Sequence, residues 1–226
     1  MDVRRETGVA MMMAMGAMLL MSALGMALVL TTSSEAVIAA NFRDAAEGMY
    51  AADAALERAL DDLSAARDWN AVLAGAVQST FVDGPPSGTR TLADGSTIDL
   101  ERIVSLANCG KIQPCRDADM DAVTSQRPWG SNNPRWQLYA YGKLRDMLPA
   151  HTIDSSYYVI VMVGDDPSDT DGTPLEDGID TAGAGVVALH AEAIGPRGAR
   201  RAVDLTIARP GGAQPGVRVL SWREVR

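Results

Sequence analysis

The chain has 226 residues, of which 20 are Lys or Arg and 29 are Asp or Glu, so its net charge is −9. Hydrophobic residues make up 47% of the chain, which is enough for a packed core and excludes global disorder. The acidic balance argues against a nucleic-acid partner, because Lys and Arg make most phosphate contacts. Two His and two Cys leave few of the ligands that most zinc sites need.

The N-terminal part is a short basic stretch followed by a long apolar segment. Residues 9–30 contain no charged side chain, and as a helix they would span about 33 Å, close to the hydrocarbon thickness of a bilayer. A buried core helix and a cleaved secretory signal are the alternatives, although a signal usually has a shorter apolar region. Arg4 and Arg5 precede the segment, and the first charge after it is Glu35. The positive-inside rule therefore keeps residues 1–8 in the cytoplasm and exports the rest.

Residues 31–69 have helical periodicity and are expected to continue this helix. Apolar or small side chains recur every three or four residues, at Ile38, Phe42, Ala45, Met49, Ala52, Leu56, Leu60 and Leu63. The two segments form either one helix or two, because residues 31–34 are Thr and Ser, which are good N-caps. The Ala-rich face suits close packing against a domain or a neighbouring helix, and a membrane-anchored coiled coil is the alternative.

Beyond Trp69, short alternating runs predict strands. They lie at residues 97–106, 135–144, 157–163, 186–194, 201–208 and 217–222. The turn sequence of residues 195–198 predicts a hairpin between two of them. Because no helix is predicted between these runs, the sheet should be mostly antiparallel. The predicted fold class is α+β, with a long N-terminal helix packed on an antiparallel sheet.

Cys109 and Cys115 lie six positions apart in a loop that contains Gly and Pro. In an exported domain such a pair should form a disulfide, which stabilises the fold by about 2 kcal/mol in the entropic model. A redox-active pair and two free thiols are the alternatives, although the spacing is not Cys-x-x-Cys.

Residues 165–180 form an acidic segment with seven carboxylates, and no Lys or Arg occurs between Asp146 and Pro196. Crowded carboxylates repel each other unless solvent or a cation separates them, and alternating Asp beside Gly is typical of Ca²⁺-binding loops. The spacing does not fit an EF-hand, because Pro167 and Gly178 would occupy its first and last ligand positions. The segment is therefore either a solvated connection between strands or an irregular Ca²⁺ site. The candidate ligands are Asp165, Asp166, Asp169, Asp171, Asp177 and Asp180.

Motifs that would indicate catalysis do not occur in the sequence. It contains no Gly-x-Ser-x-Gly, no phosphate-binding Gly loop and no His-Glu-x-x-His. His151 and His190 are expected to be structural or surface residues. We therefore expect no catalytic residue, no enzymatic activity and no cofactor apart from Ca²⁺.

The N-terminal segments resemble those of type IV pilins and pseudopilins. Residues 4–8 read Arg-Arg-Glu-Thr-Gly and look like a prepilin leader before its apolar run. Residues 35–60 resemble the segment that follows the membrane helix in PilX-type pilus assembly proteins, and residues 191–201 resemble their C-terminal part. The resemblance implies that a prepilin peptidase cuts between Gly8 and Val9, that the new N-terminus is methylated and that the apolar helix is retained.

One position departs from the pilin pattern. Met13, the fifth residue after the implied cleavage, stands where most pilins have a Glu. In that family the Glu pairs with the terminal amine of a neighbouring subunit, and a buried unpaired charge is costly. Members without the Glu include PilX-type minor pilins and the tip pseudopilin of type II secretion, so the resemblance implies a tip or initiating subunit.

The resemblance thus predicts a minor pilin-like structural subunit of a type IV pilus. Its parts would be the leader (1–8), a transmembrane helix (9–30), an amphipathic continuation (31–69) and a head (70–226). The chain would lie in the inner membrane with its head in the periplasm, and outside the cell once assembled. Expected partners are the membrane, prepilin peptidase, other pilins or pseudopilins, and a tip adhesin or surface ligand. The alternatives are a tip pseudopilin of a type II secretion system and a membrane-anchored Ca²⁺- or ligand-binding module that never polymerises.

Overall fold

A computed structural model describes residues 6–123, 128–148, 152–169, 171–177, 184–210 and 216–225 of the chain. The chain divides into two compact units, Met1–Asp44 and Ala45–Arg226. Helix α1 (Glu6–Ala65) begins in the first unit and ends in the second, and the second contains every described strand.

Helix α1 is a single helix, which decides between the two arrangements left open by the sequence. The hydroxyls of Thr31 and Thr32 donate to the carbonyls of Ala27 and Leu28, four residues earlier, so they do not cap a new helix. The helix ends at Ala65, four residues before the predicted end. A separate short helix, α2 (Trp69–Leu73), then begins, because the Asp68 carboxylate accepts a hydrogen bond from the Asn70 amide.

In the first unit, α1 carries its apolar side chains on the outside. Every residue from Gly8 to Arg43 is exposed within the chain, and 74% of the surface of Met12 and of Met21 is accessible. One stretch of 18 residues has a mean hydropathy of 2.1. The helix is therefore long and apolar enough to cross a membrane.

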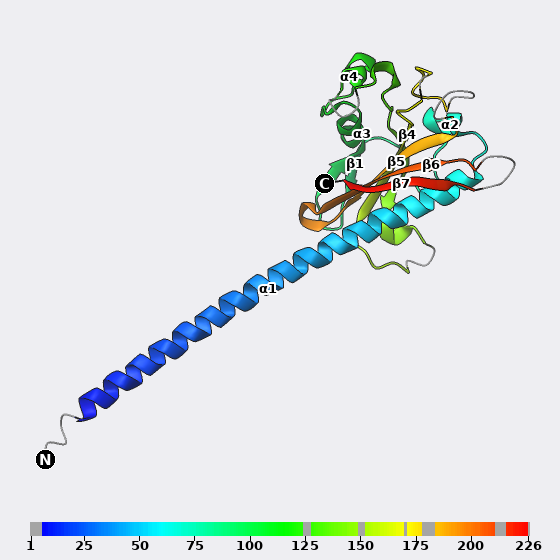
Figure 1. Ribbon diagram of the computed structural model, residues 1–226. Helices are drawn as coiled ribbons and strands as arrows, with labels where there is room; N and C mark the ends of the chain where they lie inside the picture. Colours follow the sequence, from blue (N-terminus) through cyan, green and yellow to red (C-terminus); the bar gives the residue numbers. More distant parts are fainter. Residues whose placement is uncertain are drawn as a thin grey trace. The chain divides into compact units, whose positions relative to one another are not determined.

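The second unit contains a five-stranded antiparallel sheet in the order β3-β4-β5-β6-β7 (Figure 1). The strands are β3 (Gln137–Lys143), β4 (Tyr158–Asp165), β5 (Val186–Ile194), β6 (Arg200–Ala208) and β7 (Arg218–Val225). Five of the predicted runs therefore form strands, and the antiparallel α+β class is confirmed. The predicted hairpin at residues 195–198 is also confirmed: it contains η4 (Pro196–Gly198), and the Gly195 amide donates to the Ala199 carbonyl at 2.8 Å.

The prediction of a strand at residues 97–106 is largely wrong. Only β2 (Thr97–Asp99) is extended, paired with β1 (Thr89–Thr91), and the rest is helix α3 (Leu100–Cys109). Asp99 caps this helix by accepting from the Arg102 amide at 3.1 Å, and Gly110 ends it with a φ of 67°. Helix α4 (Asp117–Asp121) and the 3-10 turns η1 (Gly130–Asn132) and η2 (Leu144–Asp146) follow. The prediction that no helix lies between the strands is therefore also wrong, although the antiparallel sheet inferred from it is confirmed.

The side chains of β4 divide the core of this unit into two layers. Val159, Val161 and Val163 belong to the cluster that includes α1 and α2, whereas Tyr158, Ile160 and Met162 belong to the cluster that includes α3. Strands place successive side chains on opposite faces, so the sheet is covered on both sides of β4. All eight residues of β4 are accordingly buried.

The Ala-rich face of α1 packs on the first of these layers, as its periodicity predicts. Its buried hydrophobic residues are Ala51, Ala52, Ala55, Leu56, Ala59 and Leu63. Small side chains let the helix backbone approach the sheet closely. Ile38 and Phe42, which the same periodicity places on this face, are exposed at 67% and 76%.

Enlarging a buried Ala on this face should destabilise the second unit. Ala59 has no accessible surface, so Ala59→Leu must displace the sheet or its own side chain, and we expect a loss of about 1–3 kcal/mol in the free energy of unfolding. The same change at the exposed Ala65 should alter it by less than about 0.5 kcal/mol. Urea unfolding of the full chain in detergent measures both, and equal losses would contradict the close packing of α1 on the sheet.

Candidate functional site: an acidic loop beside a cleft

The connection between β4 and β5 carries most of the candidate ligands. It begins after Asp165, the last residue of β4, and ends before Val186, the first residue of β5. Asp165 is 1% exposed and Asp169 is fully buried, so this acidic segment is not simply a solvated surface loop. Asp180 lies outside the described residues.

Three of the predicted ligands come together. Asp165, Asp169 and Asp171 each contribute one carboxylate oxygen to a group in which all oxygens lie within 4.8 Å of one another. Local turns produce this arrangement. Asp169 Oδ1 accepts from the Asp171 amide at 3.0 Å, and Asp171 Oδ1 accepts from the Thr173 amide at 2.7 Å. The loop thereby curls back beside the end of β4.

The other two described candidates bind elsewhere. The Asp166 carboxylate accepts from the amide and the hydroxyl of Ser168, at 3.0 and 2.5 Å. Asp177 Oδ1 accepts from the Gly185 amide at 2.5 Å, and the Asp177 amide donates to Asn70 Oδ1 at 2.7 Å. Asp177 therefore fastens the end of the loop to α2, and neither residue belongs to the group of three.

Burial and the neighbouring carboxylates disfavour negative charge on Asp165. Burial raises the pKa of Asp165 to about 7, and the neighbouring carboxylates of Asp169, Asp171 and Asp177 add to the effect, while the Asp166 amide opposes it. In the part of the chain that the structure describes, Asp169 Oδ2 is buried without a hydrogen-bond partner. A buried acceptor in this state is costly, so this one oxygen lacks a compensating donor among the described residues.

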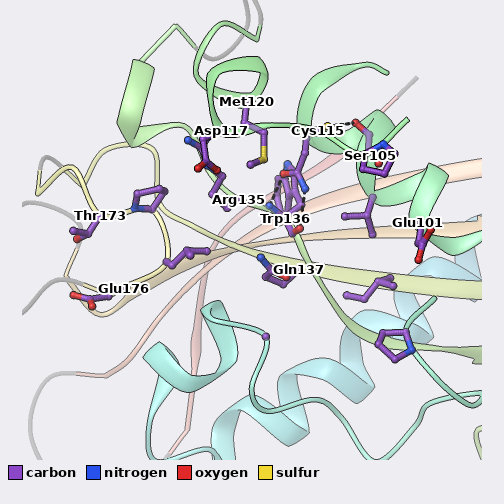
Figure 2. Close-up of a pocket in the computed structure, with 18 of the residues that line it drawn as sticks. Glu101, Ser105, Cys115, Asp117, Met120, Arg135, Trp136, Gln137, Thr173 and Glu176 are labelled. Carbon is purple, nitrogen blue, oxygen red and sulfur yellow. Dashed lines mark hydrogen bonds between the residues drawn. The ribbon is translucent and has the colours of Figure 1, made fainter. Parts of the chain in front are cut away.

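A cleft of about 890 Å³ lies beside the loop. One wall is the stretch from Gly172 to Glu176, and the opposite wall comes from α3 and Cys115. Figure 2 shows Thr173 and Glu176 on one side of Arg135 and Trp136, with Ser105 and Cys115 on the other. The loop that carries the three carboxylates is therefore also part of the cleft.

The floor of the cleft is held by buried polar contacts. Asn108 on α3 exchanges two hydrogen bonds with the backbone of Trp136, at 2.7 and 3.0 Å. Arg135 is 7% exposed and pairs with Asp121, the last residue of α4. Among the described residues that line the cleft there is no His, and the one Cys is in a disulfide.

The predicted disulfide between Cys109 and Cys115 is confirmed, with 6.1 Å between the two Cα atoms. It joins the last residue of α3 to the segment before α4 and so fixes the wall of the cleft that faces the acidic loop.

A second charged cluster lies across β5, β6 and β7. His190 Nδ1 lies 2.7 Å from Asp204 Oδ1, and His190 Nε2 lies 3.1 Å from Glu192 Oε1. Arg223 donates to Asp204 at 2.6 Å, and Arg200 donates to Glu192 at 2.5 Å. Burial lowers the pKa of His190, but the hydrogen bonds to Asp204 and Glu192 outweigh it and raise the pKa to about 9. His190 is therefore a charged link between strands.

The implied leader cleavage site lies in the first unit. Gly8 and Val9 are near the start of α1, and Val9 is 54% exposed. No atom beyond its immediate helix neighbours would come within 4 Å of a Cβ added to Gly8. Met13, at the position of the missing Glu, is 70% exposed.

Some residues that support the site carried no signal in the sequence. Asn132 Oδ1 accepts from the Gly172 amide at 2.9 Å, and Asn70 accepts from Asp177 in the same way. Asn132 and Asn70 are 40 and 107 residues away in the sequence from Gly172 and Asp177, respectively. Only the tertiary fold brings each Asn to its partner.

Comparison of the chain with protein-family models, with curated proteins and with solved structures found no match.

The His190 cluster should make stability depend on pH. The pKa of His190 in the folded state is above its value of about 6.5 in the unfolded chain, so its contribution is complete below pH 6.5 and is lost as pH rises to about 9. We expect this loss to be about 2–3 kcal/mol in the free energy of unfolding of the full chain in detergent. His190→Gln should remove it, and an equal decline between pH 6.5 and 9 in both proteins would contradict this role.

Proposed function

We propose that the chain is a minor pilin-like subunit of a type IV pilus, processed after Gly8 and placed at the tip or at the start of assembly. The observation that carries the proposal is one helix with two different surfaces. Helix α1 begins within the Arg-Arg-Glu-Thr-Gly segment, exposes an uncharged apolar stretch over residues 9–30, and ends with an Ala-rich face buried against an antiparallel sheet.

The exposed apolar stretch needs an apolar environment. Lipid chains and the apolar helices of other subunits meet this need equally well, so such a helix can leave the bilayer for a bundle of similar helices at little cost in hydration. All backbone groups within a helix are already paired, which either environment requires. The first unit thus has the surface that a filament core needs.

Met13 supports a tip or initiating position. A mature chain that begins at Val9 would bring a positive terminal amine into this apolar environment, and a carboxylate near it would offset the cost. Residues 9–30 offer no carboxylate to a neighbour. A subunit with no neighbour beyond it has no such amine to neutralise, so it does not need the Glu that shaft subunits carry.

Processing by a prepilin peptidase tests the proposal directly. Co-expression with the peptidase should remove residues 1–8, and the intact mass should fall by those eight residues, with one methyl group added to Val9. Gly8→Val should block the cut, whereas Gly16→Val should not. Neither glycine has an atom within 4 Å of an added Cβ beyond its own helix, so the two changes differ in recognition and hardly in packing. A full-length mass beside a correctly cut control pilin would contradict the proposal and favour an anchored module that does not polymerise.

Assembly provides the second test. The processed chain should appear in sheared filaments at far fewer copies than the shaft subunit, and Gly8→Val should be absent from that fraction. Detection by antibody and electron microscopy should place it at filament ends. Uniform labelling along the shaft would contradict the tip or initiating position.

A further inference from the structure

The three clustered carboxylates at the end of β4 are not neutralised by the part of the protein that the structure describes. Asp165 and Asp169 are buried, and the hydrogen bonds that reach the group come from backbone amides of the loop itself. Asp169 Oδ2 is buried with no partner in the described part of the chain. This unpaired oxygen is an observation separate from the acidic composition of the loop, and a cation is a ligand that would satisfy it.

The arrangement of the oxygens matches one hard divalent cation. Ca²⁺ binds carboxylate and carbonyl oxygens at about 2.3–2.6 Å, so oxygens on opposite sides of the ion can lie nearly 5 Å apart. The oxygens of Asp165, Asp169 and Asp171 lie within 4.8 Å of one another, which fits a shared ion. Mg²⁺ requires shorter bonds in a stricter octahedron, and an irregular loop satisfies it less well.

We propose that Asp165, Asp169 and Asp171 form a Ca²⁺ site that ties the β4–β5 loop to the end of β4 and so holds one wall of the adjacent cleft in place. This inference does not rest on the proposed pilin function, because every residue in it belongs to the second unit and none takes part in processing.

The link to the cleft follows from the chain itself. Asp171 is followed directly by the stretch from Gly172 to Glu176 that lines the cleft. That stretch is already fastened to η1 through Asn132 and, just beyond it, to α2 through Asn70. Directly before Gly172, the loop meets the end of β4 at the Asp cluster, where negative charges oppose one another. A bound cation would replace this repulsion with attraction and so anchor the wall at a third place.

Calorimetric titration of the full chain in detergent with CaCl₂, after removal of metal with chelator, tests the site. We expect one bound Ca²⁺ per chain, and a rise in the unfolding midpoint of roughly 5–10 °C at a hundredfold excess over the Kd. Mg²⁺ should bind at least tenfold more weakly. No heat and no shift with Ca²⁺ would overturn the proposal, as would Mg²⁺ binding of equal strength.

Two variants separate the cluster from general acidity of the loop. Asp169→Asn keeps an oxygen to accept from the Asp171 amide but removes one charge, so it should fold at least as stably as the metal-free protein and bind Ca²⁺ at least tenfold more weakly. Glu176→Gln removes a carboxylate from the same loop outside the cluster, and should bind as the unmodified chain does. Equal binding by Asp169→Asn would overturn the assignment of the ligands.

Hydrogen exchange measures the effect on the cleft. Ca²⁺ should slow amide exchange in the described residues from Gly172 to Glu176 and should leave the β5–β6 hairpin unchanged. In Asp169→Asn the slowing should vanish. Binding without any change in exchange of this segment would remove the link to the cleft wall.

Discussion

Burial of strand β4 on both faces is the constraint on which the rest of the second unit depends. Its valines pack on the layer of α1, and Tyr158, Ile160 and Met162 pack on the layer of α3, so neither face is free for solvent. The Ala-rich end of α1 packs closely against the sheet and covers the first face of β4. Helix α3 and the adjacent β1–β2 hairpin cover the second face. Because β4 is buried to its last residue, Asp165 brings a carboxylate into the edge of the core. The acidic loop begins at that point, and its chemistry follows from the packing of the sheet.

The elements that could be predicted are those whose side chains follow a simple period. The buried valines of β4 and the buried aliphatic residues of β6 alternate with residues of the other face, and the Ala-rich face of α1 repeats every three or four residues. The strands and the helix can therefore be recognised in the sequence. Helix α3 was missed because Thr97 and Ile98 favour a strand, although Asp99 and Gly110 provide a cap and a stop for a helix. The strand propensity and the helix caps therefore favour different structures for this segment. The helix forms because it packs Leu100 and Ile103 into the core layer that contains Tyr158, Ile160 and Met162.

The site was predictable in composition but not in geometry. Seven carboxylates without a nearby Lys or Arg predict repulsion or a cation, yet the sequence does not say which of them meet. The Asp166 carboxylate accepts a hydrogen bond from the Ser168 amide, and the Asp177 carboxylate accepts one from the Gly185 amide. Neither of them joins the group of three. Asp165 joins Asp169 and Asp171 because the strand ends there. The cleft was not predicted at all, since its walls come from α3, the disulfide loop and the acidic loop, which only the folded sheet brings together.

The two charged clusters of the second unit show what neutralisation does to buried carboxylates. Burial alone would raise the pKa of Glu192, yet His190 and Arg200 lower it below its usual value. Asp165 is also buried, and burial raises its pKa to about 7, because its neighbours are other carboxylates that add to the effect of burial and do not oppose it. In the His190 cluster, β5, β6 and β7 supply both positive and negative side chains, which pair with one another. In the Asp cluster, the described chain supplies only negative charge. In the proposed site the opposite charge comes from solution, as a divalent cation that binds the three carboxylates together and not as protons that leave three separate acids. A cluster whose oxygens lie within 4.8 Å of one another favours the cation, because protonated acids have no need to converge.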